Sequence, residues 1–174
     1  MRRNLLLTSA LLLAITATAQ TPRPGTVHTP DVDLATFTFG TPSPAKVPVI
    51  AVNGGPGLSH IYILQNDMWP RVSHSRMVVF YDQRGTGASQ HLREGAPQTM
   101  EAQVADLDAV RASLHVEKVD LVGDSYGGLL VSAYAAAHPE HVNALVLSDS
   151  AAPGFAELHP RLGEAFPDVI AHEK

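Results

Sequence analysis

The residues best able to do chemistry are Gly123-Asp-Ser-Tyr-Gly127, which match the pattern Gly-x-Ser-x-Gly. A serine hydroxyl becomes a nucleophile when the backbone presents it on a sharp turn and a base removes its proton. Glycines two residues to either side leave room for such a turn between a strand and a helix. The pattern makes Ser125 a candidate nucleophile, and it places the Tyr126 N–H where negative charge would develop on an acyl group.

The flanking segments decide whether this match is meaningful. Val119–Val122 (VDLV) is typical of a buried strand, and the small, apolar residues 126–137 predict a helix. A strand, a tight turn and a helix in direct succession are the setting in which a serine stands out from the carboxyl end of a sheet. The alternative is an ordinary strand-to-helix turn with a capping serine, which is the weaker interpretation because both flanks fit.

A second loop, Asn53-Gly-Gly-Pro-Gly57, follows an earlier apolar run over residues 47–52. Small residues at this point allow the backbone to approach the serine and to offer an N–H to an oxyanion. Taken alone, the loop is better explained as an ordinary Gly/Pro turn. Because it precedes the serine pattern in the same chain, we favour the oxyanion role.

The elements that must position these loops alternate along the chain. The clearest helix covers residues 99–115, where Thr99 can cap the first turn and apolar residues recur every three or four positions. These apolar residues are Met100, Val104, Leu107, Val110 and Leu114. Further helices are expected over residues 59–69 and 126–137, and strands over 31–40, 47–52, 77–81, 119–122 and 142–147. This alternation predicts an α/β fold with a mostly parallel sheet and helices on both faces.

The first residues of the chain have a different character. A positively charged start is followed by an apolar run over residues 5–15 and by Ala17-Thr-Ala19, which together predict a cleavable signal peptide over residues 1–19. The alternative, a membrane anchor, would need about 20 apolar residues. We therefore expect a periplasmic or secreted protein without stable membrane insertion after cleavage. Residues 20–30 are rich in Pro and Thr and are expected to form a linker.

Composition excludes several classes of function. The net charge is −5, and no stripe of Lys or Arg suits nucleic acid. The absence of Cys excludes a thiol nucleophile, a disulfide and a thiolate zinc site. None of the nine His has the spacing of metal ligands, and we expect His138 and His141 to be surface residues. No metal and no other cofactor is expected, and the expected partner is a small peptide or ester substrate.

Three motifs in this order resemble the proline iminopeptidase group of α/β-hydrolases, serine peptidases that remove N-terminal proline. The motifs are NGGPG at 53–57, DQRGTGAS at 82–89 and GDSYGG at 123–128, where the group shows HGGPG, DQRGxGxS and GxSxGG. The resemblance implies an α/β-hydrolase core over residues 31–150, with Ser125 as nucleophile and the N–H groups of Gly55 and Tyr126 as the oxyanion hole. Asn53 departs from the group, which has His there.

The residues of the second motif have two possible roles. Asp82 and Arg84 resemble the group's structural loop, and we favour a structural role because local hydrogen bonds explain a turn of this composition.

The resemblance also implies what should follow. Residues 151–174 are expected to begin a cap, and the acid and base that activate the serine are expected beyond it, so that this N-terminal part would be inactive alone. Asp149 is an alternative acid, and neither His159 nor His172 is assigned as the base. Two alternatives remain open: another serine hydrolase such as an esterase or acyltransferase, and a truncated, non-catalytic remnant.

Overall fold

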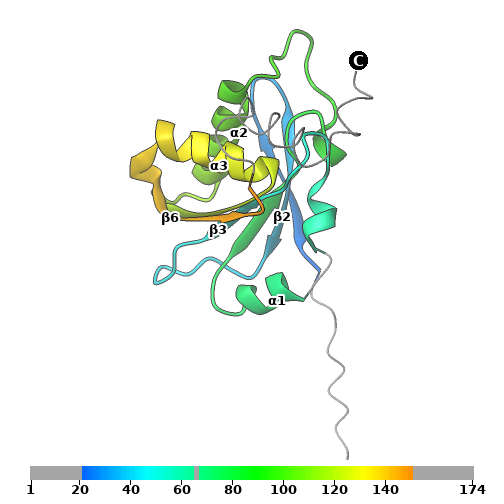
Figure 1. Cartoon of the computed structure of the whole chain (residues 1–174). Helices are drawn as coiled ribbons and strands as arrows, with labels where there is room; N and C mark the ends of the chain where they lie inside the picture. The colour runs from blue at the N-terminus through cyan, green and yellow to red at the C-terminus, as the bar shows by residue number, and fades with distance from the viewer. Residues whose placement is uncertain (1–20, 65–66, 151–174) are drawn as a thin grey trace, which may run out of the picture.

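The computed structural model describes residues 21–64 and 67–150. The strands of its sheet are β1 Arg23–His28, β2 Asp33–Phe39, β3 Val49–Val52, β4 Val78–Tyr81, β5 Val119–Asp124 and β6 Val142–Ser148. The α-helices are α1 Met68–Ser73, α2 Met100–Ser113 and α3 Tyr126–Ala137, and the short 3₁₀ helices are η1 His60–Leu64, η2 Gly87–Ser89 and η3 Pro139–His141. Figure 1 shows the helices packed around the sheet.

The strands lie in the order β1-β2-β4-β3-β5-β6. The pairs β4–β3, β3–β5 and β5–β6 are parallel, whereas β1 and β2 join the sheet antiparallel. Each parallel strand reaches the next through a segment that contains a helix, as parallel neighbours require. The predicted α/β fold with a mostly parallel sheet is confirmed.

Side chains alternate between the two faces of the central strands. Ile50, Val52 and Leu121 pack with α2 and α3 on one face, whereas Val49 and Ala51 pack on the other face. Trp69 of α1 belongs to that second cluster. Because both faces are covered by helices, β3 and β4 are completely buried, which is why they read as continuous apolar runs.

Helix α2 follows the predicted pattern closely. The hydroxyl of Thr99 accepts a hydrogen bond from the Ala102 N–H, so the predicted cap is formed. Val104, Leu107 and Val110 are buried, and burying each such side chain contributes about 1.5–3 kcal/mol. The remaining residues of the predicted stripe, Met100 and Leu114, pack against the same core while partly exposed.

The linker expected over residues 20–30 is not what the structure shows. Arg23–His28 form β1, which pairs antiparallel with β2 from Arg23 opposite Thr38 to His28 opposite Asp33. Most of its side chains are exposed, so the strand lacks the apolar signal that marks the inner strands. Pro24 is tolerated because β1 lies at the edge of the sheet, where a missing N–H costs little.

The helix expected over residues 59–69 is also wrong in detail. The structure has the short η1 and then the separate helix α1, which contains Pro70 near its start. Proline fits the first turn of a helix because the N–H groups there have no partner within the helix. Pro70 therefore belongs to the beginning of a helix, whereas the sequence pattern had placed it after the end of one.

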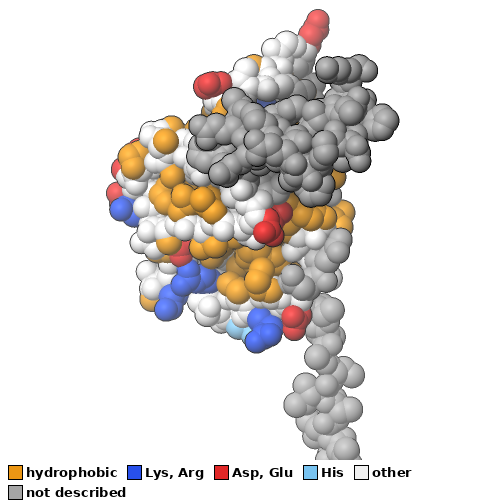
Figure 2. All heavy atoms as spheres, viewed as in Figure 1, with side chains coloured by type: hydrophobic (Ala, Val, Ile, Leu, Met, Phe, Trp, Pro, Cys, Tyr) orange, Lys and Arg blue, Asp and Glu red, His pale blue; other side chains and the backbone are white. Residues whose placement is uncertain are grey.

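The edge of the sheet formed by β6, opposite to β1, is apolar. Leu145, Val146 and Leu147 of β6 are 39%, 53% and 50% exposed. Hydrophobic side chains also gather on the face of the molecule that Figure 2 shows.

The expected signal peptide over residues 1–19 and the expected start of a cap over residues 151–174 lie outside the described residues. Within the described ranges, no helix is both long and apolar enough to cross a bilayer.

Candidate active site

Ser125 occupies the turn between strand β5 and helix α3. Its backbone has φ 52° and ψ −117°, a conformation that residues with a side chain rarely adopt. Such a conformation costs on the order of 1–3 kcal/mol and persists only where the surroundings enforce it. The chain thus turns sharply at Ser125, as the Gly-x-Ser-x-Gly pattern predicts.

The glycines on either side of this turn are required by crowding. A Cβ added to Gly127 would collide with the carbonyl oxygen of Val52 and would lie 2.7 Å from that of Asn53. A Cβ added to Gly123 would lie 2.5 Å from the carbonyl oxygen of Gly127. The expectation that these two glycines make room for the turn is confirmed.

Backbone hydrogen bonds hold the turn in place. The Ser125 N–H donates to the carbonyl of Ser148 at the end of β6, at 2.9 Å, and the Gly128 N–H donates to the carbonyl of Ser125 at 3.0 Å. The Tyr126 N–H belongs to the first turn of α3, where a helix supplies no acceptor. No described residue accepts a hydrogen bond from this N–H, and the N-terminus of a helix is a favourable position for an anion.

The loop Asn53–Gly57 lies directly against the serine turn. A Cβ added to Gly54 would be 2.7 Å from the Cβ of Ser125 and 3.1 Å from the carbonyl oxygen of Asp124. Gly55 has φ 104°, which only glycine adopts readily. Its N–H makes no hydrogen bond to a described residue. The structure brings the two predicted loops together, as expected from the sequence.

The side chain of Asn53 holds the backbone of this loop through hydrogen bonds. It is completely buried, and its Nδ2 donates to the carbonyls of Gly54 at 3.0 Å and Leu58 at 2.8 Å. The Nε2 of Gln83 donates to the carbonyl of Asn53 at 2.7 Å. The residue that departs from the resembling group therefore acts as a brace for the backbone.

Two residues that the sequence analysis did not single out lie beside the serine. The hydroxyl of Tyr62 accepts a hydrogen bond from the Gly54 N–H and donates one to the carboxylate of Asp124. Burial, together with the hydrogen bond to Asp124, raises the pKa of Tyr62 to about 12, so the phenol keeps its proton at neutral pH. Tyr62 and Asp124 are 62 positions apart in the sequence, so no local spacing could have revealed the pair.

Asp82 is a structural residue, as expected. One carboxylate oxygen accepts from the Nδ1 and the backbone N–H of His60, at 2.7 and 2.9 Å, and the other accepts from the Ala88 N–H at 2.8 Å. Burial opposes ionisation, but these hydrogen bonds hold the pKa of Asp82 below its usual value. His60, which stacks on Phe37, is a partner that the sequence pattern did not reveal.

Arg84 is likewise part of the framework. It is buried and pairs with the buried Asp106 through two hydrogen bonds, at 2.7 Å from Nε and 2.8 Å from Nη2. Further hydrogen bonds reach the carbonyls of Pro97 and Ala102. With its donors used in this way, Arg84 fixes the loop after β4 against the start of α2.

The described residues do not supply an obvious base or a metal site. No described histidine is hydrogen-bonded to the Ser125 hydroxyl, and Asp149 follows β6 with φ 44°. His159 and His172 lie outside the described residues. His138 and His141 are partly exposed beside Glu140, in line with the surface position expected for them. Among the described residues, no three His, Cys, Asp or Glu side chains could together hold a metal ion.

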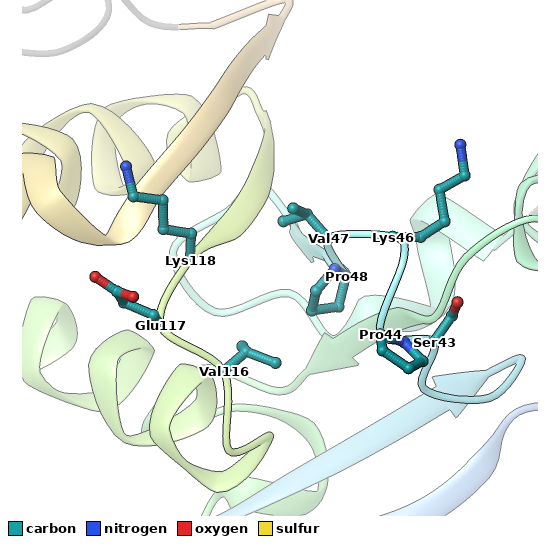
Figure 3. Close-up of a pocket in the computed structure, with 8 residues that line it drawn as sticks. All are labelled: Ser43, Pro44, Lys46, Val47, Pro48, Val116, Glu117 and Lys118. Atoms are coloured by element: carbon teal, nitrogen blue, oxygen red, sulfur yellow. The ribbon is translucent and has the colours of Figure 1, made fainter.

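A surface hollow elsewhere in the structure is separate from this site. Its lining comes from the segment before β3 and the segment before β5, including Lys46, Pro48 and Lys118 (Figure 3). Ser125 and the Asn53–Gly57 loop follow the carboxyl ends of these same strands. Since ligands of open parallel sheets bind beyond the carboxyl ends, the hollow is not the candidate active site.

Comparison with known protein families and relatives shows what this chain is similar to. A family model described as alpha/beta hydrolase fold matches residues 47–171. The chain is similar to the proline iminopeptidase of Lactobacillus helveticus, with 37% identity over 120 residues, which cover 66% of this chain and 40% of that protein. It is similar to the proline iminopeptidase of Thermoplasma volcanium, with 36% identity over 104 residues, 59% of this chain and 34% of that one. The chain therefore spans less than half the length of these relatives.

The chain is also similar to solved structures. The chain resembles the structure of VinJ with a TM-score of 0.72 and 29% identity, over 87% of this chain and 52% of that one. It resembles a putative epoxide hydrolase from Pseudomonas aeruginosa with a TM-score of 0.63 and 25% identity, over 80% of this chain and 43% of that one. Since the family model matches well over half of the sequence, the chain belongs to the alpha/beta hydrolase fold family.

Proposed function

We propose that this chain carries the nucleophile and the oxyanion hole of a serine hydrolase that removes proline from the N-terminus of peptides. The observation that carries the proposal is the strained turn at Ser125, which stands between β5 and α3 beside the Asn53–Gly57 loop. A strained backbone conformation that the surroundings enforce is a common property of residues that react.

In the proposed reaction, the Oγ of Ser125 attacks the carbonyl carbon of the substrate and forms a carbon–oxygen bond. The carbonyl oxygen becomes negative and accepts hydrogen bonds from the N–H groups of Gly55 and Tyr126. A base takes the serine proton and delivers it to the amine nitrogen as the C–N bond breaks and the amine leaves. Water then gives a proton to the same base and attacks the acyl carbon, so that proline is released and the proton returns to the Oγ of Ser125. We propose that this base and its acid come from outside the described residues, since no described histidine contacts the hydroxyl.

The substrate class rests on similarity. Three motifs, at residues 53–57, 82–89 and 123–128, resemble the proline iminopeptidase group. Relatives with that name share 35–37% identity with long stretches of the chain. The Asn53 side chain braces the loop backbone, and this supports the oxyanion role of Gly55 although the group has His at position 53.

The experiment compares amide substrates that differ in the N-terminal residue or in whether its amine is free. The enzyme, purified from its complete gene, is assayed with prolyl p-nitroanilide, with its N-acetylated form and with alanyl p-nitroanilide. We expect release from the free prolyl amide and none from the acetylated one. Ser125→Ala should lower the rate by about 10³-fold or more, because the acyl-enzyme can no longer form.

Three results would reject all or part of this proposal. Turnover of p-nitrophenyl esters without any release from prolyl amides would identify an esterase or acyltransferase of the same fold. Prolyl amide release that persists unchanged in Ser125→Ala would reject the serine mechanism. Absence of all activity in the complete gene product would favour a non-catalytic protein.

We further propose that the protein is exported. The positive start, the apolar run over residues 5–15 and Ala17-Thr-Ala19 support this proposal. Mass spectrometry of the protein from its natural host should find a mature N-terminus at Gln20. An intact Met1 in the cytosolic fraction would reject export.

A further inference from the structure

We infer that Tyr62 is a positioning residue that sets the distance between the oxyanion loop and the nucleophile turn. This inference rests on the proposed serine hydrolase function and assigns a role to a side chain that belongs to neither loop. Tyr62 lies in η1, and its hydroxyl bridges the Gly54 N–H and the carboxylate of Asp124. One oxygen atom thus joins the residue before Gly55 to the residue before Ser125.

The contacts around Gly54 explain why such a bridge is needed. A Cβ built on Gly54 would lie 2.5 Å from the Tyr62 hydroxyl oxygen and 2.7 Å from the Cβ of Ser125. Gly54 is therefore in contact with both the tyrosine hydroxyl and the nucleophile. A small displacement of Tyr62 would move the loop relative to the serine, and displacements of this kind are costly for catalysis.

The bridge also determines which amide can serve the oxyanion. The Gly54 N–H is occupied by Tyr62, whereas no described residue accepts from the N–H groups of Gly55 or Tyr126. Fixing the first glycine in this way orients the peptide plane that follows it. The loop can then present the Gly55 N–H without rearrangement, which is the property that makes an oxyanion hole effective.

The charge of Asp124 requires a donor at this point. A carboxylate next to the nucleophile would repel the negative charge that develops on the substrate oxygen. The Tyr62 hydroxyl donates to this carboxylate and turns its own lone pairs toward the Gly54 N–H. Tyr62 therefore both anchors the loop and holds Asp124 in a fixed direction.

The test measures the reactivity of Ser125 and the state of the Gly54 amide in the protein purified from its complete gene. The reactivity is the rate constant of inactivation by a fluorophosphonate, expressed per labelled site. Tyr62→Phe should lower this rate constant by about tenfold or more, because the oxyanion donors lose their alignment. Amide exchange at Gly54, followed by NMR, should become faster in the same variant.

Tyr134→Phe is the matched control. The Tyr134 hydroxyl also donates to an aspartate, Asp108, at 2.8 Å, but it lies further along α3, about 12 Å from Tyr126 at a rise of 1.5 Å per residue. A loss that reflects only stability would appear equally in this control. We expect Tyr134→Phe to leave the labelling rate constant and the Gly54 exchange rate within about twofold of wild type.

Asp124 variants separate positioning from charge. Asp124→Asn keeps an oxygen that accepts from Tyr62 and should retain most of the rate, whereas Asp124→Leu should lose as much as Tyr62→Phe. The double variant Tyr62→Phe/Asp124→Leu should be no slower than either single variant, because both remove the same bridge.

The outcomes distinguish this inference from the proposed function. A wild-type labelling rate in Tyr62→Phe together with unchanged Gly54 exchange would overturn the positioning role. If wild-type Ser125 does not react at all, the serine hydrolase proposal fails, and the Gly54 exchange alone then decides whether Tyr62 holds the loop.

Discussion

His60 and Asp82 are joined twice, since the ring Nδ1 and the backbone N–H of His60 both lie within 2.9 Å of the same Asp82 oxygen. Both side chains are buried, with 6% and 3% of their surfaces exposed. This double contact ties the segment after the Asn53–Gly57 loop to the turn after β4. The candidate site therefore depends on a polar link that itself does no chemistry.

Removing the Asp82 carboxylate should destabilise the fold strongly. Asp82→Ala leaves the His60 ring and two backbone N–H groups without their acceptor, and the expected loss is about 2–4 kcal/mol in the free energy of unfolding. Urea denaturation measures this loss. Asp33→Ala is the control, because Asp33 makes only exposed pairs with His28 and Arg93, and its loss should change the stability much less. Equal losses in the two variants would contradict a structural role for Asp82.

The same carboxylate should shape the stability at acid pH. Although burial opposes it, hydrogen bonding holds the folded-state pKa of Asp82 below its unfolded value, which is about 3.9. Its contribution to stability is therefore present above about pH 4 and is lost as the pH falls through the folded-state pKa. We expect the urea midpoint of Asp82→Asn to fall less than that of wild type as the pH is lowered from about 6 to 3. If the urea midpoint of the variant falls with pH as steeply as that of wild type, Asp82 does not contribute to the acid dependence of stability.

Gly127 should not tolerate a methyl group. Alanine normally stabilises a helix by about 1 kcal/mol relative to glycine, but here the added Cβ meets the backbone of Val52, at the end of β3, and of Asn53, which follows it. We expect Gly127→Ala to lower stability by about 1–3 kcal/mol and to reduce labelling of Ser125. In Gly95→Ala the new Cβ meets no atom within 4 Å, so only the strain of its φ of 78° remains. If Gly127→Ala is the more stable of the two in thermal unfolding, the crowding argument is wrong.

Arg84 should not be replaceable by lysine. Lysine keeps the charge but cannot form the two parallel hydrogen bonds to Asp106, and it leaves that buried carboxylate incompletely paired. Arg84→Lys should cost about 2–4 kcal/mol in the free energy of unfolding. Arg93→Lys tests the same change at an exposed pair with Asp33 and should cost less than about 1 kcal/mol. Similar costs at both positions would contradict this account.

The sequence predicted those elements whose local pattern carries the information. The Thr99 cap, the apolar stripe of α2 and the helix over residues 126–137 all reflect the backbone rules of single elements. The turn at Ser125 was predictable because glycines two residues on either side are a local steric requirement. The pairing of the two loops was expected because the loop at residues 53–57 precedes the serine pattern in the same chain, and the structure explains it, since parallel strands place their carboxyl ends at one edge of a sheet.

The features that the sequence did not predict depend on tertiary contacts. The residues of β1 are mostly exposed, and two of them, Pro24 and Gly25, are typical of loops. Only the pairing with β2 makes this segment a strand. Pro70 signals the start of a helix as well as an end, and spacing could not decide between them. The bridge from Tyr62 to Asp124 joins segments that are far apart in the chain, so its partners could be identified only in three dimensions.

The most direct test of the central claim is to locate the adduct of a fluorophosphonate by peptide mass spectrometry in the protein purified from its complete gene. The account predicts a single adduct on Ser125, which is lost in Ser125→Ala and is kept in Ser132→Ala, a serine of α3 whose hydroxyl donates to the Gly128 carbonyl. An unlabelled Ser125, or an adduct on another serine that survives Ser125→Ala, would contradict the claim that this turn presents the nucleophile.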